Sequence, residues 1–134
     1  MDMLRKTTLT VALLLIAALT ITACGGGEAS TDTSASTGDE LFQQTTIGSL
    51  AGCKTCHSLE PGVIIIGPSL AGIGTLAESR VTGVSAEDFL RQSILDPNAH
   101  LVEGFPANVM PNTYQKQLTE EQVEALVNYM LALK

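Results

Sequence analysis

Five consecutive residues, Cys53-Lys54-Thr55-Cys56-His57, bring together two thiols and an imidazole. At this spacing the thiols can add to the two vinyl groups of a haem, while the following histidine turns its imidazole onto the iron. The pattern therefore predicts one covalently attached haem c, bound through Cys53 and Cys56, with His57 as an iron ligand.

Two other kinds of site use paired cysteines at this spacing. A thioredoxin-like dithiol needs a βαβ context, which the surrounding sequence does not predict. A zinc site needs a second pair of ligands, and the remaining cysteine, Cys24, lies far upstream. We therefore favour haem attachment over both.

A low-spin electron carrier needs a second axial ligand, for which the candidates are Met110, Met130 and His100. Met110 stands in a loop before Pro111, upstream of the last predicted helix, so it can approach the face of the haem opposite His57. Met130 falls on the buried face of that helix and is better explained as a core side chain. His100 is the main competitor, and otherwise a surface histidine. Methionine opposite histidine raises the reduction potential.

The last helix is the clearest of the elements that must position these groups. Thr119 and Gln122 form a capping box at its start. Apolar residues then recur at helical spacing and predict one buried face. They are Val123, Leu126, Val127, Met130 and Leu131.

Two further helices precede it. One is predicted to begin at Ser85, with Asp88 as its reciprocal cap, and to end before Pro97. Its expected buried residues are Phe89, Leu90 and Ile94. The other runs from about Asp39 through Phe42. By composition, residues 63–66 could form a short buried strand, although no neighbouring strand is predicted to pair with it.

The N-terminus has the features of an export signal. Arg5 and Lys6 precede an apolar segment, and small residues follow up to Ala23. The run Ile21-Thr22-Ala23-Cys24 resembles the bacterial lipobox, in which the cysteine is lipidated. We expect a lipoprotein signal peptide over 1–23, a flexible tether with lipidated Cys24 over 24–37, and one domain over 38–134. The alternative is an uncleaved signal anchor.

Charge and composition narrow the functions further. The formal net charge is −7, and removal of residues 1–23 takes away two basic side chains and one acidic, which leaves −8. Nucleic-acid binding is not expected, because it needs a basic surface. Three phenylalanines, two tyrosines and no tryptophan make a small core, which a covalently bound apolar cofactor would complete.

Several residues together resemble a class I cytochrome c over the whole domain: Gly38, Phe42, residues 53–57, Gly67, Pro68, Met110, Pro111 and Tyr129. The resemblance implies an all-α fold of about 3–5 helices wrapped around one covalently attached haem. It implies that Gly38 or Phe42 packs against Tyr129 where the first and last helices cross. It also implies that the Pro68 carbonyl accepts a hydrogen bond from His57. The step from Phe42 to Cys53 is longer than usual in that family.

Other stretches are similar to the haem domain fused to subunit II of some bacterial oxidases, and to mono-haem lipoprotein subunits of alternative complex III. These stretches include residues 89–98, 102–105 and 110–114. Arg80 and Arg91 are possible partners of the haem propionates, and otherwise form solvated salt bridges.

The sequence thus predicts an electron-transfer protein anchored to the outer face of the cytoplasmic membrane. It would carry single electrons in a respiratory or photosynthetic chain, as a tethered shuttle or as a subunit of a quinol-oxidising or terminal oxidase complex. Its expected partners are redox proteins and the membrane, with no nucleic acid or small-molecule substrate. Docking would use either a basic partner surface or an apolar patch that includes residues 63–66. The alternatives are a haem peroxidase-like enzyme, for which His100 would be needed, or a haem-based sensor.

Overall fold

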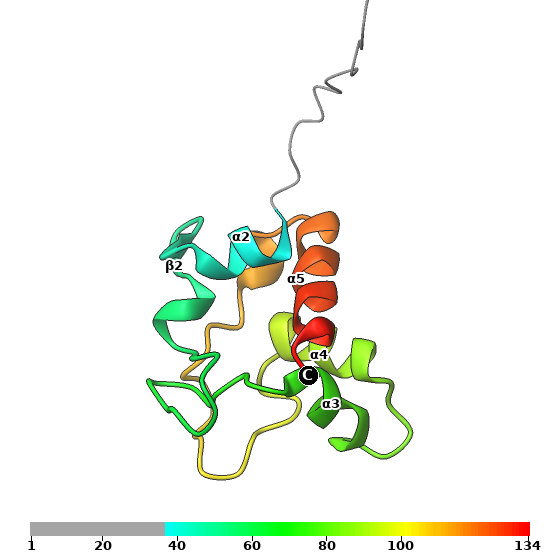
Figure 1. Cartoon of the computed structure of the whole chain (residues 1–134). Coiled ribbons are helices and arrows are strands. Elements are labelled where there is room, and N and C mark those ends of the chain that lie inside the picture. Colours follow the sequence, from blue (N-terminus) through cyan, green and yellow to red (C-terminus); the bar gives the residue numbers. More distant parts are fainter. Residues whose placement is uncertain (1–36) are drawn as a thin grey trace, which may run out of the picture. The chain divides into compact units, whose positions relative to one another are not determined.

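The computed structural model describes residues 37–134, which form a mostly helical domain (Figure 1). The α-helices are α2 (Gly38–Gln43), α3 (Ile73–Leu76), α4 (Ala86–Leu95) and α5 (Glu120–Ala132). The 3₁₀ helices are η1 (Cys53–Thr55), η2 (Ala77–Ser79) and η3 (Tyr114–Lys116). Two short strands, β1 (Thr46–Ile47) and β2 (Leu50–Ala51), pair antiparallel. The predicted signal peptide, Cys24 and all but the last residue of the predicted tether lie outside the described residues.

Helix α2 begins with a capping box that the sequence analysis did not identify. The Thr37 hydroxyl accepts from the Glu40 backbone N–H at 3.3 Å, and the Glu40 carboxylate accepts from the Thr37 N–H at 2.8 Å. Thr37, assigned above to the tether, is therefore the N-cap of the first described helix.

The crossing of α2 with α5 agrees with the expectation from the family resemblance. A Cβ atom on Gly38 would overlap the carbonyl oxygen of Ala125 and the Cβ of Tyr129, so glycine is what allows the two backbones to approach. One turn further along, the rings of Phe42 and Tyr129 pack with their centroids 5.6 Å apart.

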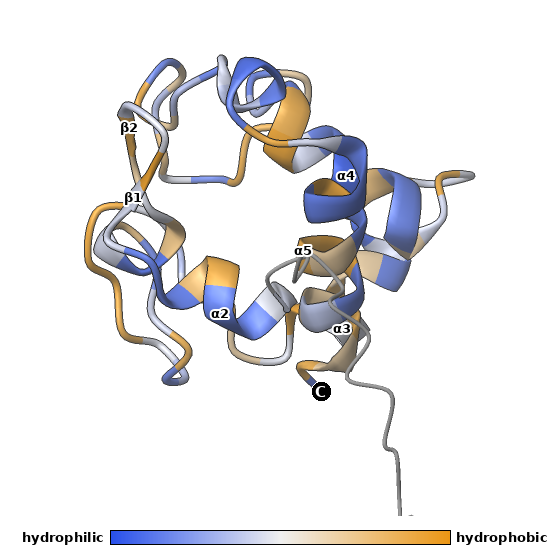
Figure 2. Ribbon diagram, turned by 90° about the horizontal axis from the view of Figure 1, so that it is seen from above, coloured by the Kyte–Doolittle hydropathy of each residue, from blue (hydrophilic) through white to orange (hydrophobic). Residues whose placement is uncertain are grey.

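Helices α4 and α5 start and end close to where their capping signals predict. Ser85 caps α4 by accepting from the Asp88 N–H at 3.0 Å. The predicted reciprocal bond to the Ser85 backbone N–H is not formed, because the Asp88 carboxylate accepts from the Ser85 hydroxyl instead, at 2.6 Å. Thr119 and Gln122 form the predicted box at α5. Both helices carry hydrophobic and hydrophilic segments, as amphipathic helices do (Figure 2). Their buried residues are Phe89, Leu90 and Ile94 on α4, and Val123, Leu126, Val127 and Met130 on α5. Leu131, expected on the same face, is only partly buried.

Residues 63–66 are not the buried strand that their composition suggested. Their side chains are 40 to 64% exposed, and their one β-type contact is an isolated bridge between Ile64 and His57. Gly62, with a φ of 73°, turns the chain just before them. Without a neighbouring strand the segment stays on the surface.

The long step from Phe42 to Cys53 contains the β1–β2 hairpin, in which Thr46 faces Ala51 and Ile47 faces Leu50. Gly48 adopts a φ of 57° at the turn, a conformation that glycine takes without strain. The hairpin thus connects the end of α2 to the start of η1.

Candidate functional site

The two cysteines and the histidine of the 53–57 motif lie on a single helical turn. Gly52 leads into η1, and its Cα packs so closely on the Gln44 carbonyl that a side chain there would overlap it. The backbone N–H groups of Cys56 and His57 both donate to the Cys53 carbonyl, at 3.1 and 2.9 Å. This turn brings both sulfurs and the imidazole to the wall of one cavity.

The His57 ring is held by its Nδ1 atom, which lies 2.8 Å from the Pro68 carbonyl oxygen. A carbonyl can only accept, so Nδ1 carries the proton and Nε2 keeps a free lone pair. Burial lowers the pKa of His57, and the hydrogen bond to Pro68 offsets only part of this effect. The ring is therefore neutral near pH 7 and is prepared to coordinate a metal through Nε2.

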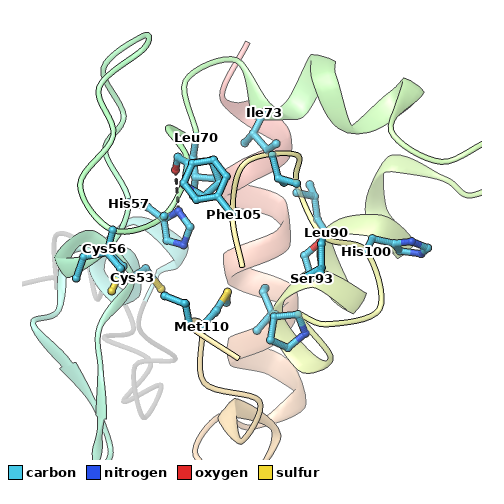
Figure 3. Close-up of a pocket in the computed structure, with 18 of the residues that line it drawn as sticks. Cys53, Cys56, His57, Leu70, Ile73, Leu90, Ser93, His100, Phe105 and Met110 are labelled. Atoms are coloured by element: carbon cyan, nitrogen blue, oxygen red, sulfur yellow. Dashed lines mark hydrogen bonds between the residues drawn. The ribbon is translucent and has the colours of Figure 1, made fainter. Parts of the chain in front are cut away.

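The five residues predicted to bind the cofactor all line the same cavity: Cys53, Cys56, His57, Pro68 and Met110. The cavity has a free volume of about 1220 Å³ with its open mouth included. Its walls are mostly apolar and include Leu70, Ile73, Leu90, Ile94, Phe105 and Met130. Figure 3 shows the cysteines and His57 together at one side of the cavity.

The three candidates for a second axial ligand are separated by their positions. Met110 comes from the loop before η3 and lines the cavity from a different segment than His57 (Figure 3). Met130 also reaches the cavity wall, but it belongs to the buried face of α5 and is 7% exposed. His100 lies at the far side, where its ring packs at a tilt of 33° against that of Phe89, with centroids 6.2 Å apart. Met110 is therefore the best placed.

The Cys53 thiol does not have the lowered pKa of a reactive cysteine. Burial raises the pKa of Cys53 to about 11, so the free thiol would be protonated at neutral pH. Reactive dithiols instead lower the pKa of the attacking cysteine. Within residues 37–134, no group of three or more histidine, cysteine, aspartate or glutamate side chains is placed to hold a metal. The raised pKa of Cys53 thus argues against a thioredoxin-like dithiol.

The two arginines considered as propionate partners differ in their surroundings. Arg91 on α4 forms an ion pair with Glu120 at the start of α5, the salt bridge that was the alternative explanation. Arg80, which follows η2, lines the cavity. Of the two, Arg80 is the one that could approach a charged group of a bound cofactor.

Tyr114 is a cavity residue whose role the sequence analysis did not recognise. Its side chain is 5% exposed, and its hydroxyl donates to the Ala51 carbonyl at 2.6 Å. Burial is the main cause that raises its pKa to about 12, so the hydroxyl stays protonated. The bond ties the chain just after Met110 to the hairpin just before Cys53. The signal available in the sequence was that Tyr114 is one of the few aromatic residues of the domain.

Together these residues fit a covalently attached haem. Two thiols on one turn match its vinyl groups, a neutral imidazole offers Nε2, and a thioether lies nearby on a different segment. The apolar walls suit a flat hydrophobic macrocycle.

Within residues 37–134, no helix combines the length and the hydrophobicity needed to span a membrane.

Comparison with known proteins gives two matches. Residues 35–134 match the family described as "Cytochrome c". The chain is also 32% identical over 111 residues to cytochrome c oxidase subunit 2 of Bacillus sp. (strain PS3). That alignment covers 78% of this chain and 27% of the relative, so the chain corresponds to about a quarter of the relative's length.

Proposed function

Since this chain belongs to the cytochrome c family, we propose that it carries single electrons between proteins of a membrane electron-transport chain. Family membership confirms the resemblance and the small helical fold expected from the sequence, and it implies haem c and electron transfer. We further propose one haem, attached through Cys53 and Cys56, with His57 and Met110 as axial ligands.

This proposal is carried by the convergence of the predicted site residues on one cavity. Cys53 and Cys56 would hold the cofactor through thioether bonds. His57 would coordinate through Nε2, while the Pro68 carbonyl orients the ring and strengthens it as a donor. When bound, haem c supplies a one-electron redox couple. The apolar walls would limit the access of water to the bound haem and so raise the potential of that couple.

An enzyme of the peroxidase type is the main alternative. It needs an open or releasable sixth position and a distal acid or base. His100 is the candidate for that role, but its ring packs against that of Phe89 at the far side of the cavity. Carbon monoxide added to the native reduced protein distinguishes an electron-transfer protein from a peroxidase-type enzyme. We expect the visible spectrum to stay unchanged, because Met110 occupies the sixth position, whereas a carbon monoxide complex would favour the enzyme.

We also propose that the domain is tethered to the outer face of the cytoplasmic membrane through lipidated Cys24. The support is the signal-like segment and the lipobox-like run that precede the domain. A tether makes weak contacts with a partner sufficient, because both proteins are held at one membrane. Cys24→Ala with a cleavable signal should release the haem protein from the membrane fraction. If the variant stays in the membrane, another anchor holds it.

The partner belongs to a respiratory or photosynthetic chain, which the protein serves as a shuttle or as a fixed subunit. The relative is named as a subunit of an oxidase, which favours an oxidase as electron acceptor. Solubilisation of the membranes in a mild detergent, followed by sizing, separates the two arrangements. A subunit elutes with a large complex, and a shuttle elutes alone.

We propose that a redox partner protein docks on the apolar rim, defined as residues 63–66, Leu101 and Val109. Ile66, Leu101 and Val109 line the cavity and are about half exposed, at 54, 53 and 48%. Residues 63–65 continue this uncharged surface without lining the cavity. The domain is acidic overall, so it lacks the basic ring that would dock on an acidic partner.

We expect the rate of electron transfer to the purified partner complex to be nearly independent of ionic strength, because the apolar rim carries no charge. Ile64→Ser should lower that rate several-fold, because it makes the rim polar without changing the cavity wall. Leu76→Ser is the matched control: Leu76 is 45% exposed and does not line the cavity. A rate that falls steeply with salt would instead indicate a basic partner surface.

A further inference from the structure

Within residues 37–134, the hydrogen bonds that hold the Met110 segment to other parts of the chain come from a single residue of that segment. Among the hydrogen bonds of residues 37–134, those that join residues 106–112 to another part of the chain both involve Asn108. Their partner is Asn98, which lies just past the end of α4. The Asn98 Oδ1 atom accepts from the Asn108 backbone N–H at 2.8 Å, and its Nδ2 donates to the Asn108 Oδ1 at 3.3 Å.

The orientation of this amide pair follows from its chemistry. A backbone N–H can only donate, so the Asn98 atom that faces it must be the oxygen. Its nitrogen then faces the Asn108 side-chain oxygen. Asn108 has a φ of 65°, in the left-handed region that asparagine adopts more readily than most residues. The bend that sets the direction of the chain two residues before Met110 is thus held by Asn98.

We propose that Asn98 is a positioning residue for Met110. Its side-chain amide holds the left-handed bend at Asn108 and so keeps the Met110 thioether at the cavity. This inference rests on the proposed role of Met110 as an axial ligand. It goes beyond that role by naming a residue on another segment, Asn98, that controls how firmly Met110 is held.

The physical consequence concerns the equilibrium between a closed loop and an open one. In the closed loop Met110 occupies the sixth position, and in the open loop an added ligand can take that position. The apparent affinity for the added ligand is therefore proportional to the open fraction. Loss of both hydrogen bonds should raise that fraction about tenfold, which corresponds to about 1.4 kcal/mol.

The test is a titration of the oxidised, haem-loaded full-length protein with imidazole, followed by visible absorption. Asn98→Ala removes both hydrogen bonds and should bind imidazole about tenfold more tightly than the wild type. Asn98→Asp keeps the acceptor for the Asn108 N–H and should restore part of the difference. Asn112→Ala is the matched control. Asn112 lies two residues past Met110, is exposed, and has no hydrogen bond within residues 37–134; its variant should match the wild type within about twofold.

A second variant covers the case in which Asn98→Ala fails to retain haem. Asn108→Gly keeps the left-handed backbone and its N–H but removes the side-chain half of the pair. It should tighten imidazole binding about threefold, half of the tenfold effect on a logarithmic scale. The sulfur-to-iron absorption band of each variant, recorded before imidazole is added, shows that Met110 still coordinates.

Two different results would overturn this inference. If the wild type shows the sulfur-to-iron band but Asn98→Ala binds imidazole no more tightly than Asn112→Ala, Asn98 does not position Met110, and the proposed ligand role remains intact. If the wild type itself lacks that band, Met110 is not the ligand. In that case both this inference and the proposed axial ligation fail.

Discussion

Met110→Ala is expected to abolish the sulfur-to-iron absorption band of the oxidised protein and to lower its reduction potential. Thioether ligation favours the reduced state, and axial ligands set haem potentials over a span of roughly 0.8 V. We therefore expect a decrease on the order of 0.1 V or more. The same change opens the sixth position, so carbon monoxide should bind the reduced variant. Visible spectroscopy and a redox titration measure all three effects.

Met130→Ala is the matched control for that substitution. Met130 is 7% exposed on α5 and packs within the hydrophobic core. Its truncation should lower the free energy of unfolding by roughly 2 to 5 kcal/mol and leave the band in place. If the band instead persists in Met110→Ala and disappears in Met130→Ala, the two assignments are reversed.

The double substitution Cys53→Ala and Cys56→Ala is expected to abolish haem retention and leave the chain poorly folded. Both sulfurs line the cavity, and its apolar walls would be left facing water once the cofactor is lost. Haem content after acid-organic extraction and the far-ultraviolet circular dichroism spectrum measure the two losses. The wild type should keep its haem through extraction, because the thioether bonds are covalent.

Lys54→Ala provides the control within the same turn. Lys54 is exposed, and its side chain is not part of the cavity wall, so this variant should retain haem and fold like the wild type. A wild-type domain that is well folded without haem would contradict the claim that the cofactor completes the core.

The elements that were predictable from the sequence are those whose signals are local. Helices α4 and α5 begin with a serine or threonine cap and have apolar residues at helical spacing, so both N-cap residues and the buried faces were predicted, apart from the reciprocal role of Asp88. The attachment motif and the Pro68 contact were predictable for a different reason. The first is a dense chemical pattern, and the second followed from the family resemblance.

Helix α3 was missed because nothing local specifies it. It is four residues long, and its N-cap, Gly72, offers no side chain. Gly74 packs directly on the carbonyl of Leu131 in α5, so the helix depends on tertiary packing. Residues 63–66 were misjudged for a related reason. Their composition indicates extended, apolar chain but does not say whether another element covers it.

The contacts that join distant segments at the site could not be derived from spacing. Tyr114 and Ala51, which share a hydrogen bond, are 63 residues apart in the sequence. Asn98 and Asn108 are ten residues apart along an irregular loop. No periodic pattern in the sequence predicts either contact. The partners meet because packing sets the path of the loops that carry them. The sequence thus identified the groups that do the chemistry, while the structure was needed to find the residues that hold them in place.

An optical redox titration of the purified full-length protein tests the central claim, single-electron transfer by a covalently held haem, most directly. The titration is followed by visible absorption, and a parallel sample is extracted with acid and organic solvent. We predict one reversible transition that fits a one-electron process, with one haem per chain retained after extraction. A protein whose chromophore is lost on extraction, or whose transition does not fit one electron, would contradict the account.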